Sequence, residues 1–361
     1  MGRFRGFGVN FALLLISTAV SLVILEVIIR VISPMPVFGP YFDLRPYKKL
    51  KLYPDLRGLS CPAWHTANRW GMRGDDPPAN WDKCYTIIAV GGSTTQCFYL
   101  DDQKTWPHLL QEHLRDIEPN VWVGNAGLDG HSSLGHRLMM KKVVQRLRPD
   151  AVVLLVGAND LWSAASGNRY DNRFIERISN RSLPIRLYEH SRLLQILYLW
   201  KRIVFDDVTV VRRMGHGNYI PQELDAAVNE VPGDMEHKAF AEYQRNIRSI
   251  ISIARECDTR LVFLTQPTLF EDNEYWAGIS DRQYWIRKRK HQISAAATAR
   301  LLSRINQALM RICNEEQVEC FDLAARVPHS FEYFYDAFHF TEKGASLVAS
   351  EIAAHFSQHG A

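Results

Sequence analysis

Short apolar runs alternate with amphipathic segments from residue 85 to the end of the chain. The runs are five or six residues long and almost continuously apolar, as expected of strands buried on both faces of a parallel sheet. In the intervening segments, apolar residues recur every three or four positions, which is the spacing of a helix with one buried face. The predicted strands are 86–90, 121–125, 151–156, 260–265 and 319–323, and the predicted helices are 105–117, 134–147, 239–256, 296–316 and 342–357.

This alternation predicts an α/β domain over residues 85–361. We expect a three-layer α/β/α sandwich around a central, parallel five-stranded sheet. Two aromatic and charged segments, 160–235 and 266–295, interrupt the pattern as insertions. Sheets of this kind bind ligands beyond the carboxyl ends of their strands, so we expect both insertions to shape substrate access on that side.

The N-terminal residues predict a single-pass membrane anchor. Residues 9–32 are almost wholly apolar and long enough to cross a bilayer. Arg3 and Arg5 precede them, which predicts a cytoplasmic N-terminus over residues 1–8 and an extracytoplasmic domain, on the periplasmic side in a bacterium. A cleaved signal peptide is the alternative, but the apolar run is long for one and no clear cleavage site follows. Glu26, near the outer end, is spaced to pair with Arg30.

Residues 33–84 follow this anchor. They are rich in proline, aromatic and charged residues and show little periodicity, so they are interpreted as a juxtamembrane stalk that packs on the domain.

Composition narrows the function only slightly. The chain has 361 residues, is 47% hydrophobic and 23% charged, and carries a net charge of +4, which is ordinary for a globular protein. Its basic clusters, at 48–51 and 287–291, are best explained as solvated faces, and nothing resembles a nucleic-acid-binding module. Of the six cysteines, Cys61 with Cys84 and Cys313 with Cys320 are possible disulfide pairs. No metal-ligand spacing is present, so neither a metal nor a cofactor is expected, and the oligomeric state stays open.

The first predicted strand ends in Gly91-Gly92-Ser93-Thr94-Thr95. A phosphate loop would need a lysine in register, and none follows. A helix N-cap at Ser93 or Thr94 is one alternative, and a serine nucleophile on a strand-to-helix turn is another. A serine nucleophile needs a base and an oxyanion site. Other residues of the chain must therefore distinguish a nucleophile from a helix N-cap at this turn.

Three further blocks follow in order. "NAGLDG" (125–130) and "GAND" (157–160) each come directly after a predicted strand, and "DAFH" (336–339) precedes the last helix. Taken singly, each has an ordinary structural explanation, such as a left-handed turn at Gly130 or a backbone-bonded loop at Asn159. Their common placement at one edge of the sheet favours a single site.

Together the blocks resemble the SGNH/GDSL hydrolase superfamily, from residue 85 to about 355. The resemblance implies a flavodoxin-like fold and a Ser-His-Asp triad, with Ser93 as nucleophile, His339 as base and Asp336 as its orienting acid. It also implies an oxyanion hole formed by the amides of Ser93 and Gly130 and the side chain of Asn159. "TWPHLL" (105–110) resembles the helix that follows the first block of the family, and "NRWGMRGDD" (68–76) is similar to a segment that precedes this block in membrane-anchored members.

The chain departs from the family pattern at one position: Gly92 stands where an acidic residue usually precedes the nucleophile. That residue is not the triad acid, so catalysis is not excluded, but local hydrogen bonding must differ. Asp160 is expected to order its loop rather than react. Cys97 is expected to be a buried helix residue, and His131 and His136 are expected to play no primary role.

The predicted function is a membrane-anchored, extracytoplasmic serine esterase for acyl esters, favouring acetyl groups on carbohydrate. Acyl transfer to an envelope or exported polysaccharide, hydrolysis of lipid or lysophospholipid esters, and a non-catalytic binding subunit of an envelope assembly are the alternatives. Aromatic residues of the insertions are suited either to stacking on sugar rings or to packing the insertions together: Trp162, Tyr170, Tyr275, Trp276 and Tyr284.

Overall fold

The computed structural model describes residues 2–32, 42, 44–161, 187–188, 190–205, 208–214, 222–223, 233–280 and 294–359. Its main sheet has five parallel strands in the order β10-β8-β5-β3-β4, the flavodoxin-like arrangement. The predicted fold class is confirmed, and each predicted strand is found within two residues. The strands are β3 (Tyr85–Gly91), β4 (Val121–Gly127), β5 (Ala151–Leu155), β8 (Arg260–Leu264) and β10 (Glu319–Phe321).

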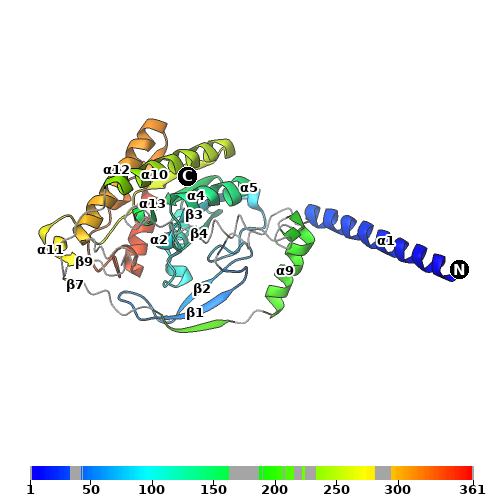
Figure 1. Ribbon diagram of the computed structural model, residues 1–361. Helices are drawn as coiled ribbons and strands as arrows, with labels where there is room; N and C mark the ends of the chain where they lie inside the picture. The colour runs from blue at the N-terminus through cyan, green and yellow to red at the C-terminus, as the bar shows by residue number, and fades with distance from the viewer. Residues whose placement is uncertain are drawn as a thin grey trace.

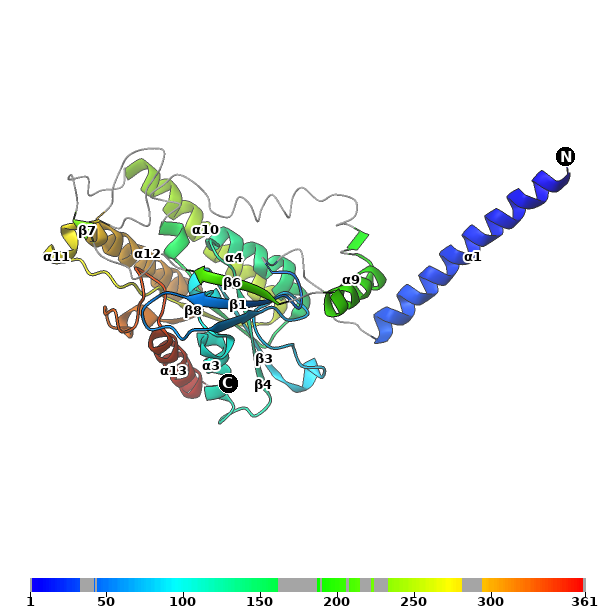
Figure 2. The same ribbon diagram turned by 90° about the horizontal axis from the view of Figure 1, so that it is seen from below.

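Helices cover both faces of this sheet (Figure 2). One layer contains α3 (Trp106–Leu114) and α13 (Glu342–His359), which pack against each other. The other contains α4 (Ser133–Met139), which continues through a π-helical turn (Met140–Val144) into α5 (Gln145–Leu147), together with α10 (Gly233–Cys257) and α12 (Ala295–Glu316). Strands β3, β4, β5 and β8 are almost completely buried between the layers, which explains their continuous apolar sequence, whereas the edge strand β10 is half-buried.

Residues 44–84, part of the segment interpreted as a stalk, form structure of their own. β1 (Lys49–Pro54) pairs antiparallel with β2 (Ala63–Thr66) and parallel with β6 (Thr209–Met214) in a separate three-stranded sheet. Trp70 and Met72 lie in the main hydrophobic core. This part of the chain is therefore packed into the domain.

The described parts of the two insertions add small elements. The first contains α9 (Arg192–Phe205), β6 and β7 (Gln222–Glu223) and runs into α10, whose N-terminus lies inside it. The second contains α11 (Glu274–Ala277) and β9 (Ile279–Ser280), which pairs antiparallel with β7. Four-residue α2 (Ser93–Gln96) and 3-10 turns at 81–83, 102–104 and 323–325 complete the helices described.

The N-terminal helix α1 (Gly2–Ile32) projects away from the α/β body (Figure 1). Its segment Val9–Ile32 is 24 residues long, has a mean hydropathy of 2.6 and is not buried against the protein, so it is long and apolar enough to cross a membrane. Arg30 Nε donates to Glu26 Oε1 at 2.8 Å, and the predicted pair is confirmed.

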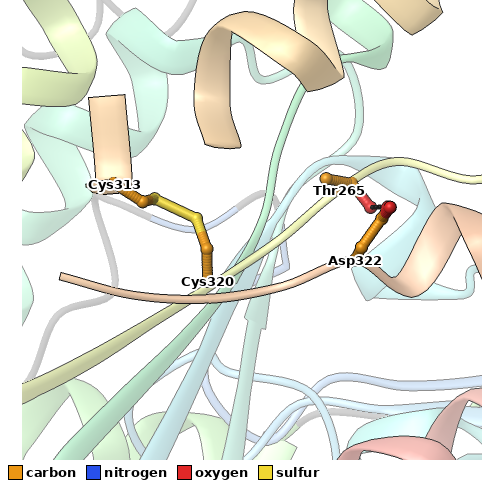
Figure 3. Close-up of a disulfide and its surroundings, with 4 residues drawn as sticks. All are labelled: Thr265, Cys313, Cys320 and Asp322. Carbon is orange, nitrogen blue, oxygen red and sulfur yellow. Dashed lines mark hydrogen bonds between the residues drawn. A yellow bond between two sulfur atoms is a disulfide. The ribbon is translucent and has the colours of Figure 1, made fainter. Parts of the chain in front are cut away.

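One of the two possible disulfides is formed. Cys313, on α12, is bonded to Cys320, on β10 (Figure 3). Cys61 and Cys84 are both free thiols, so the other suggested pair is absent from the structure.

Candidate active site

Ser93 lies at the carboxyl end of strand β3, between β5 and β4 in the sheet, where the chain turns into α2. Its side chain is partly exposed, whereas the strand residues before it are buried. The turn is tight, because a Cβ on Gly91 would lie 2.0 Å from Thr95 Oγ1. A glycine at this position therefore lets the helix begin immediately and leaves the serine at the edge of the sheet.

His339 and Asp336 come from the loop before α13 and meet Ser93 across 246 residues of sequence. Ser93 Oγ lies 2.8 Å from His339 Nε2, and His339 Nδ1 lies 2.8 Å and 2.9 Å from the two carboxylate oxygens of Asp336. Each nitrogen of the imidazole thus has a partner. This geometry suits proton transfer from the serine to a histidine that is held by a carboxylate.

The 336–339 loop holds the imidazole rigidly. Asp336 Oδ1 accepts the main-chain N–H groups of Phe338 and His339, at 3.0 and 2.8 Å. The ring of Tyr335 stacks on the His339 ring, with a centroid separation of 5.5 Å and an interplanar angle of 7°. The three-residue spacing of the aspartate and the histidine therefore forms one compact, self-bonded loop.

Electrostatics favour an ion pair between these two residues. Burial alone would lower the pKa of His339, but the carboxylate of Asp336 and, more weakly, that of Asp129 raise it above its ordinary value. Burial alone would raise the pKa of Asp336, but His339 and the two main-chain N–H groups lower it below its ordinary value. The site thus stabilises the imidazolium that forms when the histidine accepts a proton.

The groups expected to bind an oxyanion lie around the same turn. Asn159 Nδ2 donates to the carbonyl of His131 at 2.8 Å, which fixes the orientation of its amide and leaves its second N–H for another acceptor. Gly130, next to His131, has a φ of 74°, the left-handed turn that a glycine permits. Within the described part of the chain, the N–H groups of Ser93 and Gly130 donate to no protein acceptor.

The glycine that departs from the family pattern contacts one of these groups. A Cβ on Gly92 would lie 2.7 Å from Asn159 Nδ2 and 3.3 Å from the carbonyl oxygen of His131. Any side chain at position 92 would therefore displace the Asn159 amide from its present position. The present position of the Asn159 amide therefore depends on the glycine at position 92.

Asp160 has partners that suit an ordering role. Its carboxylate accepts the N–H of Ser133 at 2.9 and 3.1 Å and the Ser133 hydroxyl at 2.6 Å, and Asn246 on α10 donates to that hydroxyl at 3.1 Å. These bonds tie the loop after β5 to the first turn of α4. A carboxylate at a helix N-terminus is also favoured by the helix dipole.

The other nucleophilic or basic side chains near the turn are sequestered. Cys97 is buried, and burial raises the pKa of its thiol to about 11. It lies directly after α2 with a φ of 52°, not inside the helix. His136 is buried, and this burial, followed by the effect of His131, lowers its pKa well below the ordinary value. His131 is buried and contributes its carbonyl oxygen to the site.

Arg73 is a supporting residue that the sequence did not single out. Its side chain is 2% exposed, its Nε donates to Asp102 at 2.8 Å, and its terminal nitrogens donate to four main-chain carbonyls. Those carbonyls belong to Trp64, Gln96, Cys97 and Leu100. Arg73 therefore clamps the chain just after α2. The only signal in the sequence was the segment "NRWGMRGDD", which the resemblance marked without a role.

Two other features lie apart from the triad. Glu319, His355 and His359 each place one oxygen or nitrogen atom within 4.8 Å of the others, as the ligands of a metal ion would be placed. The carboxylate of Glu319 is, however, already paired with Arg260 through two hydrogen bonds. This cluster lies at the opposite end of the strands from Ser93. A cavity of about 850 Å³ lies beyond β8 and β10, lined by residues such as Gln266, Arg300 and Asp322, and it includes neither Ser93 nor His339.

The five aromatic residues suggested for stacking on sugar rings divide into three groups. Trp276 is 6% exposed and packs on Phe270, with ring centroids 5.0 Å apart. Tyr275 is 62% exposed. Trp162, Tyr170 and Tyr284 lie outside the described residues. Of these two residues, only Tyr275 presents its ring to solvent, and one side of that ring packs edge-on against Trp276, with centroids 4.9 Å apart.

Comparison with known proteins identifies the family. A sequence model of the GDSL-like lipase/acylhydrolase family matches residues 89–347. Esterase TesA of Pseudomonas aeruginosa is 32% identical over 75 residues, which are 21% of this chain and only 37% of the length of that relative.

Two solved structures show a weak overall likeness. They are Axe2, an acetylxylan esterase from Geobacillus stearothermophilus (14% identity, 75% of this chain and 93% of that chain, TM-score 0.42), and TesA (14% identity, 76% and 98%, TM-score 0.43). The assignment depends on the family match, which covers most of the chain and includes all four blocks of the site. The chain belongs to the GDSL-like lipase/acylhydrolase family and is an ester-hydrolysing enzyme.

Proposed function

We propose that Ser93, His339 and Asp336 are the catalytic triad of this esterase. Ser93 Oγ attacks the ester carbonyl while His339 Nε2 accepts its proton, and the imidazolium then protonates the leaving alkoxide. Water, deprotonated by the same histidine, releases the acid from the acyl-enzyme. The observation that carries this proposal is the 2.8 Å separation of Ser93 Oγ and His339 Nε2, with Asp336 on the opposite ring nitrogen.

The oxyanion of the tetrahedral intermediate would be bound by three donors. These are the N–H groups of Ser93 and Gly130 and the second N–H of Asn159 Nδ2. The bond from Asn159 to the His131 carbonyl supports this role, because a donor that is already oriented needs no reorganisation during the reaction. Asp160 supports the arrangement by holding the adjacent loop against α4.

We propose acyl esters on carbohydrate, with acetyl as the acyl group, as the substrate class. The exposed ring of Tyr275, in the second insertion, gives this proposal its structural support, because such a ring can stack on a sugar. Transfer of the acyl group to a sugar hydroxyl uses the same acyl-enzyme. Product analysis with and without an acceptor sugar separates transfer from hydrolysis.

We also propose that α1 remains attached as an anchor, with the enzyme outside the cytoplasm. Its length and hydropathy support insertion, and Arg3 and Arg5 support a cytoplasmic N-terminus. The bond between Cys313 and Cys320 supports an oxidising compartment.

Hydrolysis of p-nitrophenyl acetate tests the triad. Ser93→Ala and His339→Ala should each lower kcat on the order of 10⁶-fold, because the nucleophile and its base act as one unit. Ser303→Ala and His113→Ala are matched controls at exposed positions and should retain the wild-type rate. Equal rates for wild type and Ser93→Ala would refute the proposal.

A further inference from the structure

The outward face of α9 is unusually apolar for a helix in contact with water. Its side chains on that face recur at helical spacing and are 40–68% exposed, whereas Gln195, on the opposite face, is 3% exposed. An exposed apolar patch of this kind normally marks a contact with a partner or a membrane. Its members are Leu194, Leu197, Trp200, Ile203, Val204 and Phe205.

The N-terminus of α9 is bonded directly to the outer part of α1. The Glu26 carboxylate accepts the N–H groups of Arg192 and Leu193, at 2.8 and 2.9 Å, and the hydroxyl of Ser191 at 2.9 Å. Arg30 bonds both to Glu26 and to the carbonyl of His190. The first N–H groups of a helix need such acceptors, and the helix dipole favours a carboxylate there. Glu26 therefore fixes where α9 begins relative to the anchor.

The position of Glu26 along α1 sets the depth of α9. Seventeen residues separate Val9 from Glu26, which at about 1.5 Å per residue is roughly 26 Å. The hydrocarbon core of a bilayer is about 30 Å thick. With Val9 at the inner boundary, Glu26 lies about 4 Å inside the outer boundary, and the last residues of α1, up to Ile32, cross that boundary. α9 starts at this level and lies across the base of α1 instead of continuing it (Figure 1).

We propose that α9 is an in-plane membrane helix, with its exposed apolar face inserted at the boundary between headgroups and acyl chains. The inference rests on the proposed anchoring by α1. Amphipathic helices of this type bury their apolar face about 5–10 Å into that boundary, and tryptophan is favoured there. Lys201 is exposed and, at i+4 from Leu197, lies within this apolar face; its aliphatic stem can lie along the face while its ammonium extends to lipid phosphates. Together with α1, this second contact would fix the orientation of the catalytic domain relative to the bilayer.

Spin-label accessibility on the full chain in phosphatidylcholine–phosphatidylglycerol nanodiscs tests the proposal. Cys61 and Cys84, the two free thiols that are not buried, are first replaced by serine. Single cysteines are then introduced at Leu197, Trp200 or Val204, with Leu15 on α1 as a lipid reference and exposed Ile117 as an aqueous reference. Collisions with oxygen and with the water-soluble NiEDDA are compared at each position.

We expect the three α9 labels to favour oxygen over NiEDDA, as Leu15 does, and Ile117 to show the opposite preference. If Leu15 lies in lipid while the α9 labels match Ile117, the in-plane helix is refuted and the anchor stands. If the Leu15 label is cleaved off or lies in water, the anchor itself is refuted and the inference with it. As a second variant, Leu197→Glu with Trp200→Glu should shift the Val204 label toward NiEDDA without changing Leu15, whereas Ile117→Glu should leave Val204 unchanged.

Discussion

At the scale of single residues, Gly92, which replaces the acidic residue usual in the family, leaves room for the amide of Asn159, the proposed oxyanion donor. The space that a side chain would occupy is taken by the Asn159 amide, 2.7 Å from the position of a Cβ. Gly92 has a φ of −87°, so alanine would cause no backbone strain. A side chain at residue 92 would instead displace the amide of Asn159.

We therefore expect Gly92→Ala to fold normally and to lose activity. Its kcat should fall toward the roughly 10²–10³-fold loss typical of a missing oxyanion donor, while its melting temperature stays near the wild-type value because the displaced atom ends a flexible side chain. Asn159→Ala should lose as much, and the double variant little more, since both changes remove one interaction. Gly278→Ala, where a Cβ meets only one atom at 3.8 Å, is the control. Additive losses in the double variant would contradict the shared role.

The environment of His339 predicts the pH dependence of the reaction. The proposed base must be neutral, so the rate should rise with pH as His339 loses its proton. Since Asp336 and Asp129 raise its pKa above 6.5, the midpoint of the rise in kcat/KM should lie above that value.

Removing either carboxylate should move this midpoint to lower pH. Asp129→Asn, at an exposed position, should shift the midpoint slightly, and Asp336→Asn should shift it further and lower kcat about 10⁴-fold. Stopped assays from pH 5 to 9, with circular dichroism as a check on folding, measure both effects. A profile that is flat across this range would exclude His339 as the base.

At the scale of elements, apolar periodicity predicted the five strands and their helices because each element buries its own face. It was least accurate at the ends. β4 continues two residues beyond Asn125, through residues with weak strand preference, because Gly127 pairs with Gly91 of β3. Helix α10 begins at Gly233, six residues before the predicted start. Such ends depend on neighbours that a single sequence does not specify.

The connection between Arg73 and the turn after α2 is a second element-scale feature. Its guanidinium satisfies four carbonyls and one carboxylate in a buried setting, and lysine lacks the planar fork that reaches them. Arg73→Lys should lower the free energy of unfolding by about 3–5 kcal/mol, as expected when a buried charged network is broken.

The same substitution should lower kcat more than it raises KM, because the turn that presents Ser93 is released. Urea unfolding and steady-state kinetics measure the two effects. Arg115→Lys is the matched control, since Arg115 forms an exposed pair with Glu112 and should change stability by less than about 1 kcal/mol. If the two variants are equally stable and equally active, Arg73 does not support the site.

At the scale of the whole molecule, the features that the sequence did not reveal are pairings between distant segments. β1 pairs with β6 across about 160 residues, and Glu26 meets Arg192 across 166. None of these segments carries a motif, so residues 44–84 were interpreted as part of a stalk, and Glu26 was expected to pair only with Arg30. Ser93, Asp336 and His339 are just as distant, but each lies in a recognisable block at the same edge of the sheet, so their meeting was predictable.

The whole molecule therefore combines a parallel-sheet esterase with the projecting apolar helix α1. The exposed apolar face of α9 lies beside the end of α1 that is nearer to the domain. The proposed chemistry depends on the carboxyl edge of the sheet, whereas α1 and α9 lie outside it (Figure 1). Because these parts are separate, catalysis and membrane attachment are testable independently.

The central claim is that Ser93 is the nucleophile, and active-site labelling tests it most directly. The full chain is treated with a fluorophosphonate until hydrolysis of p-nitrophenyl acetate stops, then digested and analysed by tandem mass spectrometry. We predict one phosphonyl group per chain, on Ser93, with a labelling rate that falls sharply in His339→Ala. Inactivation with the label on another residue, or an active enzyme in which Ser93 stays unmodified, would contradict the account.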